Sequence, residues 1–518
     1  NYTNMEFGFN YNRSFGLHTV NAVLLYTTNE STIEMLSGAR SNIFTPSVDE
    51  LFAGNASVNS TNNGTTSEFG RVGYVGRISY SYNGKYYLDG SFRSEASVNY
   101  PDGHRWGTFP SISAGWRISE EDFMKDNISW LDELKLRGSY GMAGDESGAG
   151  YSAYLYNFSV GQNSGPSSTT GKNGYIFGGN YQPSIYPGLT APNNNITWGV
   201  IKSFNAGFNL SILKGLFAAE FDVYRKNNTN VLISVTDNVP LTYGAFAPKV
   251  NMGSNHSTGF ELTLTHSNHI GKNFNYYVKG MIAHTKTITD YSGEQAGLPA
   301  WNASQLNGWG ANITRIYKSA GLFQSKEEIA GWAIQDGRNN STINPGDVKY
   351  QDLNGDHIID EKDVIVKDNI NMPLLNYSVS LGATWKHLSL DLLFQGIGDY
   401  TNMNLNRRWV NYDTRQLDRW TPDNPNASWP KLGSIASDTR VSDFYGTTSN
   451  YLRLRSAVLS YSLQPVWLKR MGLEAVTFNL QGGNLFVWSK VKFTDPENDV
   501  ITPYGPQKTY GAGVNVKF

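Results

Sequence analysis

The stretch from Asp352 to Asp363 has the composition and spacing of a calcium-binding loop. It reads DLNGDHIIDEKD, which matches the positions of oxygen ligands in an EF-hand-like loop. Ca²⁺ suits such a loop because it takes about six to eight hard oxygen ligands in a flexible geometry. The predicted ligands are Asp352, Asn354, Asp356, Asp360 and Asp363 through their side chains and Ile358 through its carbonyl group.

Two positions of this loop depart from the usual pattern. His357 occupies the sixth position, where glycine normally makes the sharp turn, and Asp363 is shorter than the usual final glutamate. The sequence therefore predicts a structural Ca²⁺ site. The alternative is a polar turn held by hydrogen bonds from aspartate and asparagine side chains to the backbone.

Tryptophans in the stretches without strand periodicity form a second group of candidates for ligand contact. Flat rings with polar neighbours stack on the apolar faces of sugars, and their amphipathic edges also suit a protein partner. The alternative is that these rings pack the loops or form an aromatic girdle. The residues predicted to contact a substrate or a covering partner are Trp198, Trp301, Trp309, Trp332, Trp409, Trp420 and Trp429.

The sequence contains no motif for catalysis or nucleic-acid binding. It lacks a G-x-S-x-G nucleophile elbow, an H-E-x-x-H zinc motif, a P-loop and a Rossmann fingerprint. The formal net charge of −2 leaves no basic footprint for nucleic acid. Without cysteine, the chain has neither disulfides nor thiolate metal sites. We therefore expect no catalytic residues and no enzymatic activity.

The elements that position these residues are predicted to be β-strands. The last residues, 510–518, alternate strictly between apolar or small side chains and polar or tiny ones, as a strand with one apolar face does. Residues 377–385 and 388–394 repeat this pattern around a two-residue turn. No run of about 18 apolar residues exists, so a transmembrane helix is not expected. Alternating strands instead predict a transmembrane antiparallel β-barrel, in which every backbone group is paired.

The connections between strands indicate which end of the barrel faces outward. Counting the alternating segments gives about fifteen strands. Short turns, predicted at Gly16-Leu17, Asn83-Gly84 and Lys386-His387 among others, alternate with long excursions, as is typical of periplasmic turns and extracellular loops. Because single-chain bacterial barrels have an even number of strands, we expect this chain to supply part of a wall. The longest predicted extracellular loops lie near 31–70, 143–200, 290–373 and 401–449.

Several motifs, in a consistent order, resemble the SusC/RagA-type family of TonB-dependent outer-membrane transporters. Each motif alone is weak, but their number and order over nearly the whole chain make the resemblance specific. They include RWGTFPSISAGWR at 105–117, LKLRGSYG at 134–141, GDVKYQDLNGD at 346–356, RWTPDNPN at 419–426, NYLRLR at 450–455 and DPE at 495–497.

The resemblance implies a plugged barrel of the 22-stranded class in the bacterial outer membrane. Residues 1–518 would form its C-terminal part, with about seven strands and the plug domain outside this chain. The family imports nutrient oligomers under a SusD-like surface lipoprotein, with energy supplied through TonB. The implied partners are therefore the N-terminal plug and barrel portion, the lipoprotein, TonB through that N-terminal part, and outer-membrane lipid.

The loop tryptophans favour glycan oligosaccharides as the imported substrate. Oligopeptide import by the same mechanism remains an alternative, and so does a passive porin or adhesin barrel without energy coupling.

Overall fold

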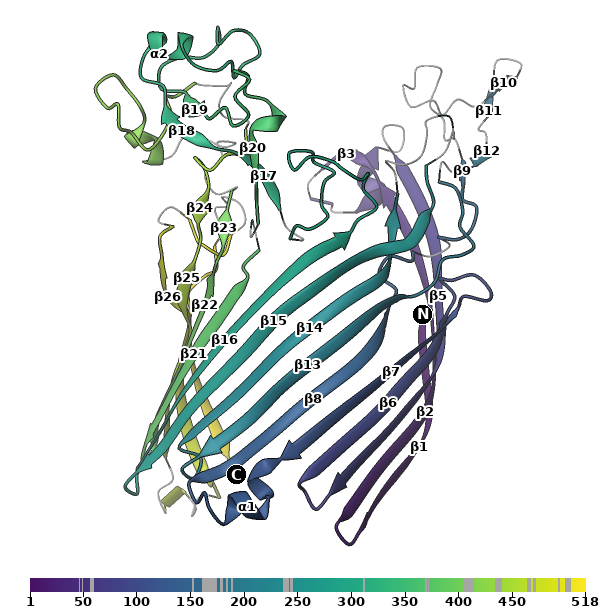
Figure 1. The fold of residues 1–518 in the computed structure, drawn as a ribbon, viewed down its shortest axis with the longest axis vertical. Coiled ribbons are helices and arrows are strands. Elements are labelled where there is room, and N and C mark those ends of the chain that lie inside the picture. The colour runs from purple at the N-terminus through teal and green to yellow at the C-terminus, as the bar shows by residue number, and fades with distance from the viewer. Residues whose placement is uncertain are drawn as a thin grey trace. The chain divides into compact units, whose positions relative to one another are not determined.

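The protein, seen in a computed structural model, consists mainly of long β-strands joined by turns and loops (Figure 1). The structure describes residues 1–45, 47–48, 50–55, 60–150, 153–160, 175–177, 180–182, 185–187, 190–235, 242, 246–310, 313–368, 370, 372–403, 414–433, 440–463, 467–468, 472–491, 494–498 and 505–518.

Fifteen strands form one antiparallel sheet, and their order in the sheet is the same as their order along the chain. This confirms the predicted all-β class and the predicted number of strands. The strands are β1 (Tyr2–Phe15), β2 (His18–Ala39), β5 (Thr61–Tyr82), β6 (Tyr86–Ser97), β7 (Trp106–Arg117), β8 (Leu131–Asp145), β13 (Gly199–Ile212), β14 (Phe217–Ser234), β15 (Lys249–Ile270), β16 (Phe274–Tyr291), β21 (Leu375–Trp385), β22 (Leu388–Gly398), β25 (Tyr451–Leu463), β26 (Ala475–Ser489) and β27 (Thr509–Lys517).

Shorter elements lie in the connections and pair among themselves. The paired short strands are β3 (Ser41–Ile43) with β4 (Gly54–Asn55), β9 (Phe158–Val160) with β12 (Ile185–Pro187), β10 (Tyr175–Phe177) with β11 (Asn180–Gln182), β17 (Thr314–Tyr317) with β20 (Val364–Lys367), β18 (Ser319–Leu322) with β19 (Val348–Tyr350), and β23 (Thr401–Asn402) with β24 (Thr447–Thr448). The helical turns are η1 (Leu51–Ala53), η2 (Ile118–Glu120), α1 (Asp122–Lys125), α2 (Lys326–Ala330), η4 (Glu361–Asp363) and η5 (Thr414–Asp418). Within the described ranges, none of the helices has the length and apolar character needed to cross a membrane.

Two compact units share the strands, and each has its own buried core. The first unit comprises residues 1–114, 139–203 and 227–254, and the second comprises 115–138, 204–226 and 255–518. In the first, Tyr100, Phe109, Ala149, Ile196 and Trp198 form a buried cluster. In the second, the main buried clusters lie in the long connections 292–374 and 399–450.

The short turns occur where the sequence predicts them. Gly16 lies in the turn between β1 and β2, and Asn83 and Gly84 lie in the turn between β5 and β6, all with positive φ. Positive φ at successive turn residues matches the right-handed twist of a hairpin, and Asn-Gly adopts it readily. Lys386 also has a positive φ, in the turn between β21 and β22.

The strands extend further into one expected loop than the alternation predicts. A long loop was expected over 31–70, yet β2 and β5 stay in register from His18↔Tyr82 to Ala39↔Thr61. The connection between them is therefore only 40–60. The partner segment 61–68 of β5, TNNGTTSE, shows no apolar alternation. Backbone pairing needs no apolar face, so the ladder continues through this segment.

Large apolar side chains are exposed along the strands of both units. In the first unit, Phe7, Phe9 and Leu24 are each more than half exposed. In the second unit, Trp385 and Leu480 are also more than half exposed. Apolar surface on this scale would be a liability in water, and it is the surface that a strand presents to lipid.

A buried ion-pair network in the second unit joins β25 to the segment 494–498. The side chain of Arg453 is only 2% exposed, and its Nη2 donates to both carboxylate oxygens of Asp495 at 2.6 Å. Its Nε donates to Glu497 at 2.8 Å, and the neighbouring Arg455 also pairs with Glu497. Two of the motifs noted in the sequence, NYLRLR and DPE, thus meet in one contact.

The substitution Arg453→Met is expected to destabilise the protein by about 3–5 kcal/mol, because it removes the cation that pairs with the buried carboxylate of Asp495 and leaves Glu497 with Arg455 alone. Urea unfolding of the detergent-solubilised protein, followed by fluorescence, measures this change. The matched control is Lys125→Met, which removes an exposed pair with Glu120 and is expected to cost about 0–1 kcal/mol. Equal losses in the two variants would show that the network contributes no more than a surface pair.

Candidate functional site in the long loops

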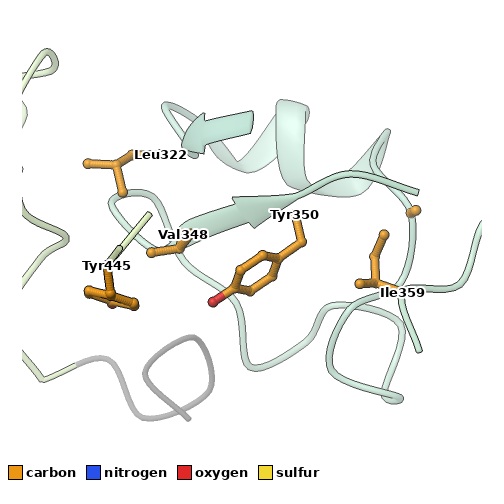
Figure 2. Packing of buried hydrophobic residues seen from close by; sticks show 6 residues of the cluster. Leu322, Val348, Tyr350, Ile359 and Tyr445 are labelled. Atoms are coloured by element: carbon orange, nitrogen blue, oxygen red, sulfur yellow. The ribbon is translucent and has the colours of Figure 1, made fainter. Parts of the chain in front are cut away.

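Two long connections of the second unit combine into a folded body, which we call the loop module (described residues 314–368 and 414–445). Its centre is a cluster of buried apolar side chains contributed by both connections (Figure 2). Trp332, Trp420 and Trp429 pack against this cluster. The cluster itself consists of Leu322, Ala333, Val348, Tyr350, Ile359 and Tyr445.

Charged side chains hold the loop module together from within. Arg440 donates from Nη2 to the carbonyl groups of Gln335 and Ile359, at 2.6 and 3.1 Å. Its guanidinium group also lies 4.5 Å from the ring centre of Tyr317. Since Arg440 is in the second connection and its partners are in the first, it ties the two together. The sequence around Arg440 gave no signal of this role.

A second cation fixes the helical end of the loop module. Lys349 pairs with Glu328 at 2.6 Å and lies 4.8 Å from the ring centre of Trp332. Glu328 belongs to α2, whose first turn is capped by the hydroxyl of Ser325. The described part of the loop module is therefore a preformed surface.

The predicted calcium loop lies within the loop module and adopts much of the expected turn. His357, at the position usually held by glycine, has a φ of 62°, and Gly355 has a φ of 79°. Asp352 accepts hydrogen bonds from the N–H groups of Gly355 and His357 at 2.7 and 2.8 Å. Although burial raises the pKa of Asp352, these hydrogen bonds outweigh it and hold the pKa below its ordinary value.

The side chains of the loop do not gather around one point. Asp363 is fully buried, and its oxygens accept from the N–H groups of Leu353, Asn354 and Asp360. Across the described part of the chain, no three carboxylate or histidine side chains are grouped as metal ligands. These hydrogen bonds from backbone N–H groups to carboxylates are those expected of a polar turn, the alternative to a calcium site. Calcium binding by Asp352, Asn354, Asp356, Ile358, Asp360 and Asp363 stays a prediction.

Most of the tryptophans proposed for substrate contact have packing roles. Trp198 is only 4% exposed, and its Nε1 donates to the carbonyl of Arg105 at 2.8 Å, so its ring offers no free face. Trp332 donates to the carbonyl of Tyr350 at 2.8 Å, and Trp420 donates to Gln324 at 3.0 Å. Trp429 packs against the same apolar cluster as Trp332 and Trp420. Four of the seven predicted contact residues are therefore in the packed surroundings that the alternative, loop packing, describes.

The other three tryptophans predicted to contact a ligand are Trp301, Trp309 and Trp409. Trp309 is half-buried and donates from Nε1 to Gln305 at 2.5 Å. Trp301 lies in the same connection and is also half-buried. Trp409 lies outside the described residues. Contact of Trp301, Trp309 and Trp409 with a ligand stays a prediction.

Comparison with known proteins gives relatives of one kind, although no family model matches the chain. The chain is 28% identical over 450 residues to TonB-dependent receptor P26 of Formosa agariphila, covering 83% of this chain and 43% of that protein. It is 24% identical over 466 residues to TonB-dependent receptor SusC of Bacteroides thetaiotaomicron, covering 86% and 44%. The chain thus spans less than half the length of these relatives.

A solved structure shares the fold. The RagAB peptide transporter superposes with a TM-score of 0.77 at 22% identity, covering all of this chain and 56% of the solved chain. These relatives are receptors and transporters, in agreement with the expectation of a protein that is not an enzyme.

If the predicted calcium site exists, Ca²⁺ will raise the thermal midpoint of the loop module, and the substitution Asp356→Asn will weaken that effect. A thermal shift series with Ca²⁺, with Mg²⁺ and with chelator measures it, together with the metal content of the purified protein. Asp423→Asn, in the same module but outside the loop, is the control. Identical thermal midpoints with Ca²⁺ and with chelator would contradict the calcium site and favour the polar turn.

Acid is expected to loosen the segment 418–429. Hydrogen bonds from Ser428 and Asn424 hold the pKa of Asp418 below its ordinary value of 3.8. A depressed pKa contributes stability above the ordinary value, and this contribution is lost as the pH falls through the lowered one. Hydrogen exchange of this segment, corrected for intrinsic rates, should rise more on acidification in the native protein than in Asp418→Asn. Equal increases would contradict this assignment.

Proposed function

We propose that this chain, a homologue of the SusC/RagA-type TonB-dependent receptors located in the outer membrane, is part of an energised importer of nutrient oligomers. The main support is the sequence similarity of a chain with a fifteen-stranded sheet to 43% of receptor P26 and 44% of SusC. The remaining strands, a plug domain and a TonB-contacting segment are the parts that this chain would need for a complete importer.

The proposed mechanism assigns this chain the wall and the outer capture surface. An oligomer binds among the long loops beneath a SusD-like lipoprotein and is enclosed there. A pull from TonB then rearranges the plug and releases the oligomer inward. A preformed capture surface favours binding, because less conformational entropy is lost when the ligand arrives. Arg440 and Lys349 supply that preorganisation by fixing the loop module from within.

We propose glycan oligosaccharides as the substrate class, with Trp301 and Trp309 as the aromatic contacts. Both rings are half-buried, which leaves part of each ring accessible for stacking on a sugar. The packing roles of Trp198, Trp332 and Trp420 reduce the number of rings that support this choice. Oligopeptides form the second arm of the binding experiment.

The substitution Trp301→Ala is expected to weaken oligosaccharide binding by about two- to tenfold, the range that one aromatic contact of about 0.5–1.5 kcal/mol gives. Isothermal calorimetry with the native assembly and mixed oligosaccharides measures the change. The control is Trp130→Ala, an exposed tryptophan between β7 and β8 at the short-turn end. Binding of oligopeptides, with no effect of either substitution, would overturn the glycan assignment.

Energy coupling separates this importer from a passive porin or adhesin. Uptake of the bound oligomer by cells should stop when TonB is deleted, because the plug then stays in place. Undiminished uptake without TonB would contradict the proposal and favour a passive barrel.

A further inference from the structure

A depression of about 610 Å³ lies on the strands β1, β2, β5, β6 and β7, within the first unit. The apolar residues that line it include Phe9, Leu24, Ile78 and Phe92, which are 66%, 51%, 60% and 42% exposed. Ile112 of β7 completes the lining on the far side. The depression is continuous with the exposed apolar surface of these strands.

The depression opens on the apolar face of the sheet. Registers Leu24↔Gly76 and Ile78↔Gly90 place these side chains on one face. Residues one position along the strands carry polar contacts on the other face, where Arg77 pairs with Asp89 at 2.8 Å. Because side chains alternate between faces, the two surfaces are distinct, and the apolar one is the face that a membrane strand turns to lipid.

Glycine and alanine make the floor of the depression. A Cβ atom added at Gly90 would meet no atom within 4 Å, so the space above this residue is open. Gly76 lies beneath the ring of Phe92, which forms a side wall. Ala22, paired with Ile78, adds a third small residue. Larger side chains surround these three positions, so the wall is locally hollow.

A group of aromatic rings lies between the depression and the short turns. His18 is 4.9 Å from Tyr82 and 5.5 Å from Phe15, and Tyr82 is 6.4 Å from Tyr86, all measured between ring centres. Such a girdle marks the interface between lipid headgroups and hydrocarbon. Gly90 and Gly76 lie about 13–20 Å along their strands from these rings, at about 3.3 Å per residue. The depression is therefore at hydrocarbon depth.

We propose that this depression holds one acyl chain of a phospholipid from the leaflet nearer the short turns. The aromatic girdle places the headgroup level, and the small residues provide a hollow in which the chain lies along the strands. A chain seated there contacts apolar side chains on several sides, whereas lipid elsewhere contacts the wall on one side only. The phospholipid in the depression therefore stays bound there, unlike the lipids that surround the rest of the wall.

The matched substitutions Gly90→Leu and Gly280→Leu test this proposal. Gly280 is a strand residue of β16 paired with Val379, and a Cβ atom there also meets nothing within 4 Å. Both variants add the same side chain to open space, but only the first fills the depression. Each native assembly is placed in nanodiscs containing phosphatidylethanolamine with a photoreactive group in the acyl chain. Crosslinked peptides are then mapped by mass spectrometry, and heat-modifiability on gels confirms that both variants are folded.

The expected result is that crosslinks in the unsubstituted protein concentrate in peptides from β1, β2, β5 and β6. Their yield should fall severalfold in Gly90→Leu and stay unchanged in Gly280→Leu. Crosslinks spread evenly over the exposed strands, or equally reduced by both substitutions, would overturn the proposal. Protection of these strands by a second copy of the chain would overturn it as well. None of these outcomes depends on what the protein imports.

Discussion

The structure depends on the pairing of backbone N–H and C=O groups along one continuous ladder. In hydrocarbon, an unpaired backbone group costs several kcal/mol, so a chain can cross only if every strand has a partner on both sides. Among the described residues, the thirteen inner strands of the fifteen-stranded sheet meet this requirement, while β1 and β27 at its ends each have one partner. The need to pair those two strands connects the fold of this chain to the larger barrel proposed here.

Once the ladder fixes the strands, the long connections are free to carry specific features. The loop module shows how such connections become ordered: an apolar cluster forms between them, and Arg440 and Lys349 cross-link it through hydrogen bonds and ring contacts. Arg453 performs a similar task at β25, where it binds two carboxylates in a buried site. These interactions give the long connections a defined surface without extending the sheet.

The strands and turns were predictable because each leaves a local pattern. Asn83-Gly84 and Lys386-His387 lie between alternating segments, and both adopt hairpin turns. The extension of β2 to Ala39 was missed because its partner segment in β5, residues 61–68, is polar and carries no alternation. The packing of Trp198 and Trp332 was open to two interpretations, since tertiary contacts decide whether a tryptophan is buried. In the predicted calcium loop, His357 adopts the positive φ of the turn although the sequence counted its side chain against the pattern. Ligand convergence depends on side-chain directions that spacing does not determine.

The central claim is that this chain supplies part of the wall of a larger, plugged barrel. Extraction of the native assembly in mild detergent, followed by measurement of its mass and identification of every polypeptide in it, tests that claim most directly. The account predicts additional sequence carrying a plug and about seven further strands, together with a SusD-like lipoprotein. A monodisperse assembly that contains only residues 1–518, closed on itself, would contradict it.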